Sequence, residues 1–246
     1  MKLMGIINLT PDSFYAPSRY NYSMLDRDVD IIDAGAVSTR PGAPDVDLEE
    51  EWHRLELFLE MWRERYGRNE QCGRWIGDPA RWNLHGDSPR ELSIDTTSSE
   101  IVRMAYEIVG PFIVNDISAG HDDPQMLKTV GRLGLPYVAM HKRGNPRTMD
   151  SLADTQTDII IQLKNYFHEF TIAAENAGIK DWILDPGLGF AKTAEQNIEI
   201  IERLEELQLF NRPILVGVAD KRFTGGDTAK YESLAAAHGA NILRIH

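Results

Sequence analysis

The sequence predicts an α/β fold of the (β/α)8 or TIM barrel class, on three observations. Eight short apolar runs follow one another along the chain, most of them separated by helical patterns, which is typical of parallel strands joined by right-handed crossovers. The length of 246 residues is close to the roughly 250 residues of one such barrel. Polar residues stand at the ends of most runs, where barrels of this kind carry their sites. We therefore expect residues 1–246 to form a single domain.

The eight expected strands share a short apolar run that ends in a polar loop. They are expected at residues 3–9, 29–37, 91–95, 112–117, 137–141, 182–185, 213–218 and 241–245. The sixth strand delivers Asp185 at its carboxyl end, and the Pro-Gly pair that follows stops it. Thr193 and Gln196 then form a capping box, which predicts the start of the next helix.

Helices are expected between most strands because apolar residues recur there at helical spacing. Asp47 and Glu50 form a D-x-x-E start for a helix over residues 48–66, and Asp123-Pro124 opens a helix that Gly134 closes. Further helices are expected after the third strand up to Gly110, over about residues 154–177 and over about residues 194–207. Their expected buried faces are Ile101, Met104, Ala105 and Ile108; Ile159, Leu163, Phe167, Phe170 and Ala174; and Ile198, Ile201 and Leu204.

One long connection lacks any periodicity. Residues 72–90 are rich in Gly, Pro and Trp, and we expect them to form a surface loop.

The composition narrows the class of protein. Hydrophobic residues make up 42% and charged residues 26%, as in ordinary soluble globular proteins. The net charge of −12 disfavours general attraction to nucleic acids or anionic membranes, although local Lys and Arg can still bind an anionic small substrate. Cys72 is the only cysteine, which fits a reducing compartment. Since no signal peptide or membrane span is recognisable, we expect a cytoplasmic protein without nucleic-acid or membrane partners.

The strand ends carry polar side chains that should converge on one pocket. A single Asn or Asp at a strand end is more often a turn former, but so many together predict a ligand site. The set is Asn8, Thr39, Arg40, Asp95, Asn115, Asp116, His141, Asp185, Lys221, Arg244 and His246.

The kinds of side chain in this set indicate which chemical class of ligand the pocket binds. Asp95, Asn115 and Asp185 are acceptors that suit an amino-substituted heterocycle, whose adjacent N–H donors pair with a carboxylate. The cations suit a phosphate or pyrophosphate, and Arg244 can also lie flat on an aromatic ring. No zinc-type Cys/His spacing, nucleophile elbow or G-x-G-x-x-G after a strand occurs. The mode of metal binding that fits these residues best is a hard cation that enters together with a pyrophosphate. Such a cation would contact one side-chain oxygen of the protein, such as that of Asn8.

Several of these stretches resemble dihydropteroate synthase, nearly end to end and in the family's order. They are MGIINLTPDSF at 4–14, STRPGA at 38–43, SIDT at 93–96, NDI at 115–117, MH at 140–141, DPGLGFAK at 185–192 and LRIH at 243–246. The resemblance implies a single pterin-binding barrel domain. It also implies condensation of 6-hydroxymethyl-7,8-dihydropterin pyrophosphate with p-aminobenzoate, which gives dihydropteroate and pyrophosphate on the route to folate.

The resemblance also implies roles for individual residues. Asn8 would contact Mg2+, the expected cofactor, while Asp95, Asp185 and Lys221 would be catalytic. The implied substrate-binding set is Thr39, Arg40, Asp95, Asn115, Asp185, Phe190, Lys221, Arg244, Ile245 and His246. In the family's mechanism the pyrophosphate leaves with Mg2+, and the arylamine attacks the cationic pterin methylene that forms. Stabilisation of the leaving group should be the main catalytic term.

Three departures from the family's pattern stand out. After the seventh strand the family usually has Ser-Arg-Lys-Ser, whereas residues 219–222 read ADKR; Lys221 is kept, but Arg222 replaces a small hydroxyl near p-aminobenzoate. Residues 15–28 and 223–240 are short, and no helix follows the eighth strand, so the first, seventh and eighth helices are expected to be short or missing. Since the last two helices usually build the family's dimer interface, a homodimer is possible but in doubt.

Three other interpretations stay open. A pterin-binding protein that no longer condenses would keep the pterin contacts while its second-substrate side is altered, as Arg222 suggests. The pterin-binding barrel of corrinoid methyltransferases shares the fold and the acidic contacts, but the TPDSF and STRPGA loops argue against it. A phosphate-binding aldolase barrel is weaker still, because no strand-end Lys stands in an apolar setting suited to a Schiff base.

Overall fold

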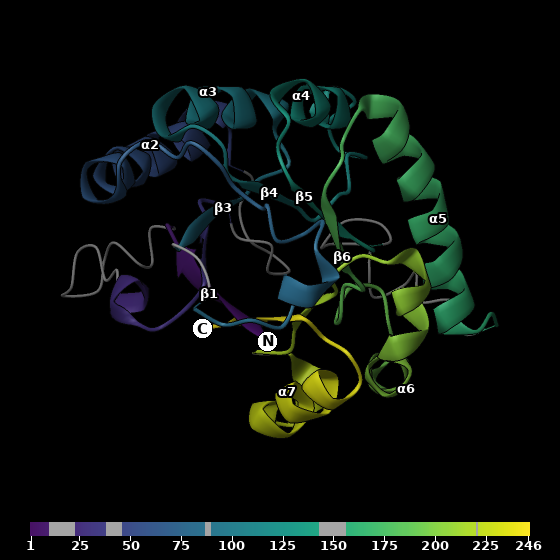
Figure 1. The fold of residues 1–246 in the computed structure, drawn as a ribbon. Helices are drawn as coiled ribbons and strands as arrows, with labels where there is room; N and C mark the ends of the chain where they lie inside the picture. Colours follow the sequence, from purple (N-terminus) through teal and green to yellow (C-terminus); the bar gives the residue numbers. More distant parts are fainter. Residues whose placement is uncertain (10–22, 38–45, 87–89, 143–155, 220) are drawn as a thin grey trace.

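The computed structural model describes residues 1–9, 23–37, 46–86, 90–142, 156–219 and 221–246. Its strands form a barrel with helices around the outside (Figure 1). The strands are β1 (Lys2–Asn8), β2 (Ile31–Gly35), β3 (Glu91–Asp95), β4 (Ile113–Asp116), β5 (Tyr137–Met140), β6 (Trp182–Asp185), β7 (Leu215–Gly217) and β8 (Ile242–Ile245). All eight expected strands are present, most of them trimmed at one or both ends.

The strands pair in parallel, in the order β6-β5-β4-β3-β2-β1-β8-β7. A single parallel bridge between Leu184 and Ile214 brings the two edge strands together, and the amide of Leu184 donates to the carbonyl of Pro213 at 2.9 Å. The predicted TIM barrel is therefore confirmed, with β6 and β7 joined by a shorter ladder than the other neighbours.

Helices follow most of the strands and cover the outside of the barrel (Figure 1). They are α2 (Leu48–Tyr66), α3 (Ser99–Val109), α4 (Met126–Leu133), α5 (Ile159–Ala177), α6 (Ala194–Glu202) and α7 (Thr228–Ala237), with 3-10 helices η1 (Ser23–Asp26), η2 (Pro79–Arg81), η4 (Leu204–Phe210) and η5 (Arg222–Thr224). None of the helices in these ranges is long and apolar enough to cross a bilayer.

Two helix starts follow the capping residues that the sequence contains. The Asp47 carboxylate accepts from the amide of Glu50 at 2.9 Å, and α2 has the predicted bounds. Thr193 and Gln196 form the predicted capping box. Such caps satisfy amides that the helix itself leaves without partners, and each contributes about 1 kcal/mol.

Three helix bounds differ from the prediction, and one of them is the start of α5, which was expected at about residue 154 and lies at Ile159. The helix expected to open at Asp123-Pro124 begins at Met126, because the Asp123 carboxylate accepts from the amides of Ser99 and Gln125 and so forms a turn. The helix expected over about residues 194–207 ends at Glu202 and continues as η4.

The buried helix faces are correct for α5 and shifted in two other helices. All five residues expected in the core of α5 are buried. In α3, Val102 and Val109 are buried while Met104 and Ile108 are half-exposed, and α3 packs against both neighbouring helices, α2 and α4. In α6, Ile200 is buried where Ile198 was expected.

The first and seventh helices were expected to be short or missing, and the elements that the structure describes there are short. The seventh helix is present as α7, with 10 residues against 19 in α2, so it is short but not missing. Between β1 and β2 the structure describes one short helical element, η1, while residues 10–22 lie outside the described ranges.

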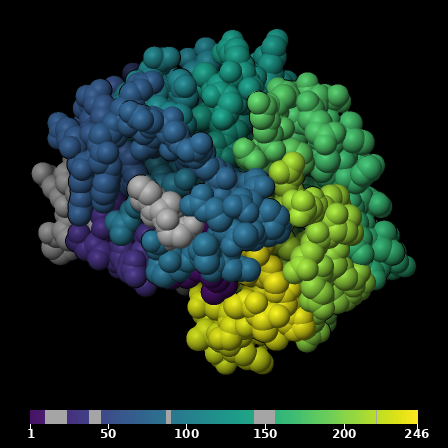
Figure 2. Space-filling model, viewed as in Figure 1, coloured from purple at the N-terminus to yellow at the C-terminus, as the bar shows by residue number. Residues whose placement is uncertain are grey.

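The expectation that residues 72–90 form a surface loop holds only in part: residues 72–86 are irregular apart from η2 and many of them are exposed, but three of their side chains enter the core. The side chains of Trp75, Ile76 and Trp82 are buried within the amino-terminal end of the barrel. They pack there against Met4, Ile31, Ile113, Val138, Ile183, Leu215 and Ile242. We call residues 72–86 the floor segment; it crosses in front of the strands in Figure 1, and its atoms cover the middle of the same face in Figure 2.

Polar contacts hold the floor segment in place. The indole N–H of Trp75 donates to Glu91 Oε2 at 2.7 Å, and the amide of Gly73 donates to Glu91 Oε1 at 2.8 Å. Lys2 Nζ donates to the carbonyl of Leu84 at 2.7 Å and lies 5.1 Å from the Trp75 ring centroid. Because single aromatic side chains from an irregular backbone fill the barrel, the segment has no periodicity that a sequence pattern could reveal.

Trp75→Ala should lower the free energy of unfolding by about 3–5 kcal/mol, because the ring is 2% exposed and its loss opens the floor of the barrel. Urea unfolding followed by circular dichroism measures this. Leu84→Ala is the control from the same segment; its side chain is 46% exposed, and the change should stay within about 0.5 kcal/mol. Equal losses of unfolding free energy in the two variants would contradict the role of Trp75 in closing the floor of the barrel.

Candidate active site

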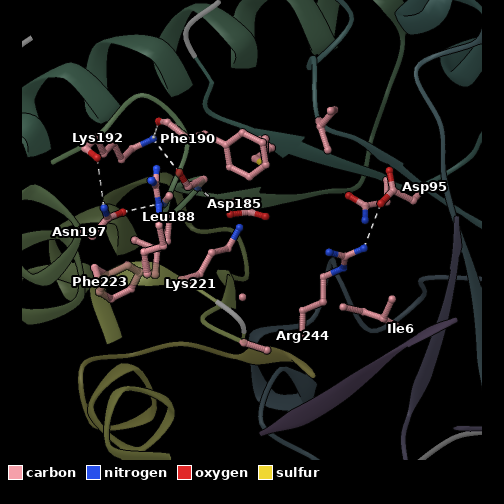
Figure 3. Close-up of a pocket in the computed structure, with 18 of the residues that line it drawn as sticks. Ile6, Asp95, Asp185, Leu188, Phe190, Lys192, Asn197, Lys221, Phe223 and Arg244 are labelled. Atoms are coloured by element: carbon pink, nitrogen blue, oxygen red, sulfur yellow. Dashed lines mark hydrogen bonds and ion pairs between the residues drawn. The ribbon is translucent and has the colours of Figure 1, made fainter. Parts of the chain in front are cut away.

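A cavity of about 880 Å3 opens at the carboxyl ends of the strands (Figure 3). The predicted site residues that line it are Asn8, Asp95, Asn115, Asp185, Phe190, Lys221, Arg244 and His246. Thr39 and Arg40 lie outside the described residues. Ile245 is not among the lining residues, since neighbours along a strand point to opposite faces, and it packs against the outer core instead.

One layer of inward side chains separates the cavity from the apolar layer that the floor segment closes. Side chains two residues apart in a strand point to the same face, so the next inward residues form a second layer above it. These residues are Ile6, Asp33, Asn115, Met140, Asp185, Gly217 and Arg244. The interior thus changes from apolar to mainly polar within one layer.

The turn after β6 fixes the position of Asp185. The amide of Gly187 donates to Asp185 Oδ1 at 2.7 Å. Gly187 has φ +65°, and a Cβ there would lie 2.0 Å from the carbonyl oxygen of His141. Only glycine fits this turn, which leaves the Asp185 side chain facing the cavity (Figure 3).

Lys192 holds the same loop together rather than acting as a free cation. Its Nζ donates to the carbonyls of Gly187 at 2.8 Å, Phe190 at 3.0 Å and His141 at 3.3 Å. Asn197 adds a second tie, because its Oδ1 accepts from the amide of Gly189 at 2.7 Å. Figure 3 shows these contacts beside the cavity. No pattern in the sequence indicates the role of Lys192 or that of Asn197.

Lys221 and Phe190 face each other across the cavity wall. Lys221 Nζ lies 4.6 Å from the Phe190 ring centroid, within the range of a cation–π contact. Gly189 makes room for this pair, since a Cβ there would lie 3.0 Å from Lys221 Cδ. In Figure 3 the Lys221 amine, the Phe190 ring and the Asp185 carboxylate border one space.

Asp33 is a further residue whose part in the site sequence reasoning missed. It is fully buried, and its Oδ1 accepts from Ser93 Oγ at 2.7 Å. Its Oδ2 accepts from Asn115 Nδ2 at 3.0 Å and from Arg244 Nε at 2.7 Å. Arg244 also donates to Asp95 Oδ2 at 2.9 Å. The one available signal was a carboxylate in the middle of an apolar run, which needs partners when it is buried.

Burial and neighbouring charges shift the acid–base behaviour of the cavity. Burial raises the pKa of Asp95 to about 7, although the Arg244 guanidinium acts in the opposite direction. Burial also raises the pKa of Asp185, against the amide of Gly187 and the charge of Lys221. Burial disfavours the charged form of Arg244, but Asp33 and Asp95 outweigh this and raise its pKa. Arg244 is therefore a permanent cation, while Asp95 changes its protonation state near neutral pH.

Two other residues that were predicted for the site, Asp116 and His141, contact the protein interior instead of the cavity. Asp116 is buried and accepts from the Tyr137 hydroxyl at 2.6 Å and from the amide of Ser118 at 2.7 Å. His141 is buried edge-on against the Tyr166 ring, with the centroids 4.8 Å apart. Neither lines the cavity.

The altered loop after β7 also reaches the cavity. Arg222 is exposed and lines it, on η5, while Asp220 lies outside the described residues.

Comparison with known proteins yields consistent matches. A family model described as pterin binding enzyme matches residues 4–70 and 84–246. The folic acid synthesis protein fol1 of Pneumocystis carinii is 37% identical over 270 residues, but the chain spans only 34% of its length. The dihydropteroate synthase of a Synechocystis species is 35% identical over 267 residues, which cover 99% of this chain and 84% of that protein.

A solved structure supports the same likeness. Dihydropteroate synthase from Xanthomonas albilineans with 4-aminobenzoic acid superposes with a TM-score of 0.80 at 29% identity, covering 100% of this chain and 87% of that one. The residues between the two ranges that the family model matches, 71–83, coincide with most of the floor segment.

Proposed function

The chain belongs to the family of pterin-binding enzymes, and we propose that its cavity condenses 6-hydroxymethyl-7,8-dihydropterin pyrophosphate with p-aminobenzoate. The bond between the pterin methylene and the pyrophosphate oxygen breaks, and a bond to the amine nitrogen forms with loss of one proton from the amine. The products are dihydropteroate and pyrophosphate. The observation that carries the proposal is a single cavity in which buried carboxylates and cations stand side by side.

The carboxylates and the amide bind the pterin ring. One oxygen of Asp185 is held by the Gly187 amide, so the carboxylate is oriented before a ligand arrives. Asp185 accepts the N–H donors of the amino edge in a charge-assisted way, while Asp95 and Asn115 accept from other donors of the ring. Arg244 offers the flat face of its guanidinium to the ring.

The cations bind the leaving group. Arg244, His246 and Lys221 line the cavity and attract the pyrophosphate. Donors that are already in place stabilise the charge that develops as the carbon–oxygen bond breaks. The reaction needs no nucleophile from the protein, because the arylamine attacks the methylene directly.

Mg2+ fits this cavity as a companion of the pyrophosphate. Within the described ranges no three His, Cys, Asp or Glu residues are arranged to hold a metal ion. Asn8 is exposed at the end of β1 and lines the cavity, so its amide oxygen can serve as one ligand. Mg2+ commonly takes one or two protein ligands and completes its shell with water and substrate phosphates. When bound, it would partly neutralise the leaving group.

A pterin-binding protein that does not condense is the second candidate. The observation that favours it is Arg222, which is exposed and lines the cavity where the family has a small hydroxyl. We retain condensation as the function, because a guanidinium there can also pair with the carboxylate of p-aminobenzoate. A cytoplasmic location and a possible homodimer remain predictions from the sequence.

Pyrophosphate release should require p-aminobenzoate, and Asp185→Asn should weaken the binding of the pterin pyrophosphate. The variant keeps the size of the side chain but turns an acceptor into a donor, which costs roughly 1–3 kcal/mol, or about 5- to 150-fold in Kd. A coupled pyrophosphate assay and titration calorimetry measure the two effects. The proposed function fails if wild-type protein releases no pyrophosphate with both substrates present, and the Asp185 assignment fails if the variant binds normally.

Binding of the pterin pyrophosphate should depend on Mg2+ and weaken with added salt, because cationic groups bind the pyrophosphate at a site that is open to solvent. Asn8→Ala should raise the Mg2+ concentration needed for half-maximal turnover by about 3- to 10-fold. A Mg2+ titration of both proteins tests this, with Asp78→Asn on the floor segment as the control. Turnover that survives EDTA unchanged would rule out the metal.

Arg222→Ser separates the two possible effects of the altered loop. If Arg222 binds the carboxylate of p-aminobenzoate, the variant should raise its KM by about 10-fold and leave the Kd of the pterin pyrophosphate unchanged. Steady-state kinetics with p-aminobenzoate as the varied substrate measure this. A faster condensation in the variant would mean that Arg222 obstructs the second site.

A further inference from the structure

The geometry points to Asp33 as a positioning residue that decides which hydrogen-bonding groups the cavity presents to the pterin ring. This inference rests on the proposed function. Asp33 does not line the cavity; it acts through Asn115 and Arg244, which do line it.

Asp33 lies below the cavity, where its two oxygens collect three donors from three different strands. Ser93 of β3 donates to Oδ1, and Asn115 of β4 and Arg244 of β8 donate to Oδ2, at 2.7, 3.0 and 2.7 Å. The side chain has no exposed surface. A buried carboxylate is stable only when hydrogen-bond donors or cations pair with its oxygens. The three donors therefore hold Asp33 in one orientation.

The orientation of the Asn115 amide follows from this contact. An amide has one donor side and one acceptor side, and a carboxylate can only accept. Since Nδ2 of Asn115 donates to Asp33, the flipped amide would set its oxygen against a carboxylate oxygen. Asp33 thereby keeps the Asn115 oxygen available as an acceptor for the N–H donors of the ring.

The guanidinium plane of Arg244 is fixed in the same way. Its Nε donates to Asp33 and one terminal nitrogen donates to Asp95 at 2.9 Å, so two donors on one side of the fork are occupied. A guanidinium held at two points cannot rotate about its last bonds without breaking both contacts. Asp33 therefore sets the face that Arg244 offers to a flat ring.

A double-mutant cycle tests the inference, with the Kd of the pterin pyrophosphate measured by calorimetry. Asp33→Ala and Asn115→Ala should each weaken binding by about 10-fold, and the double variant by much less than the product of about 100-fold. Effects that multiply would show that Asp33 does not act through Asn115, and would overturn the inference.

Conservative and matched variants exclude a general effect on folding. Asp33→Asn should stay within about threefold of wild type, because its oxygen can still accept from Asn115 and Arg244 while its amide donates to Ser93. Asp30→Ala removes another aspartate just before β2, which accepts from Leu3, His85 and Gly86 near the floor segment; it should lower the Tm and leave the Kd unchanged. An Asp30 variant that weakens binding as much as Asp33→Ala would contradict the inference.

If Asp33→Ala does not fold, Ser93→Ala provides the cycle with Asn115→Ala. It removes one of the three contacts and should weaken binding by about threefold, again less than multiplicatively in the double variant; a multiplicative result would overturn the inference. Wild-type protein that binds no pterin pyrophosphate would contradict the proposed function itself. Normal wild-type binding with a multiplicative cycle would contradict only the role of Asp33.

Discussion

The polar interior of this barrel depends on one cation, Arg244, held between the carboxylates of Asp33 and Asp95. A buried carboxylate without a partner would cost several kcal/mol, and here two of them lie in neighbouring strands. The guanidinium matches both, because its planar fork donates in two directions at once. Asn115 and Ser93 then complete the acceptor positions of Asp33. Without Arg244 the second layer of the barrel would hold uncompensated negative charge.

The floor segment also influences the polar interior around Arg244. Trp75, Ile76 and Trp82 close the amino-terminal end of the barrel, so the layer below Asp33 is apolar. Charges interact more strongly where water is excluded, and burial accounts for the raised pKa of Asp95 and of Asp185. The pKa of about 7 places Asp95 near the balance between acid and carboxylate at neutral pH. A ligand that offers N–H donors favours the carboxylate form, because only that form accepts with both oxygens.

Local signals in the sequence were enough for the architecture and much of the cavity. Short apolar runs predicted the strands, a period of 3.6 predicted the core face of α5, and the caps at Asp47 and Thr193 predicted two helix starts. The missing parts depend on contacts between distant residues. Asp33 and Arg244 are 211 positions apart, and the contacts of Lys192 depend on a turn geometry that only the folded loop defines. Likewise, the floor segment is recognisable only once a barrel exists for its tryptophans to fill.

Under the proposed function, the two substrates bind to parts of the molecule that differ in how well they tolerate amino-acid substitutions. The strand residues that we propose for the pterin have orientations fixed by buried contacts, so a substitution at Asp33 or Asn115 disturbs several partners at once. Fully satisfied buried networks of this kind are rigid. The loop after β7, which is proposed to border the arylamine, carries Arg222 at an exposed position. Substitutions at exposed loop positions usually cost less stability than those in a buried network, and this accounts for a departure from the family's pattern at residue 222 beside strand ends that keep it.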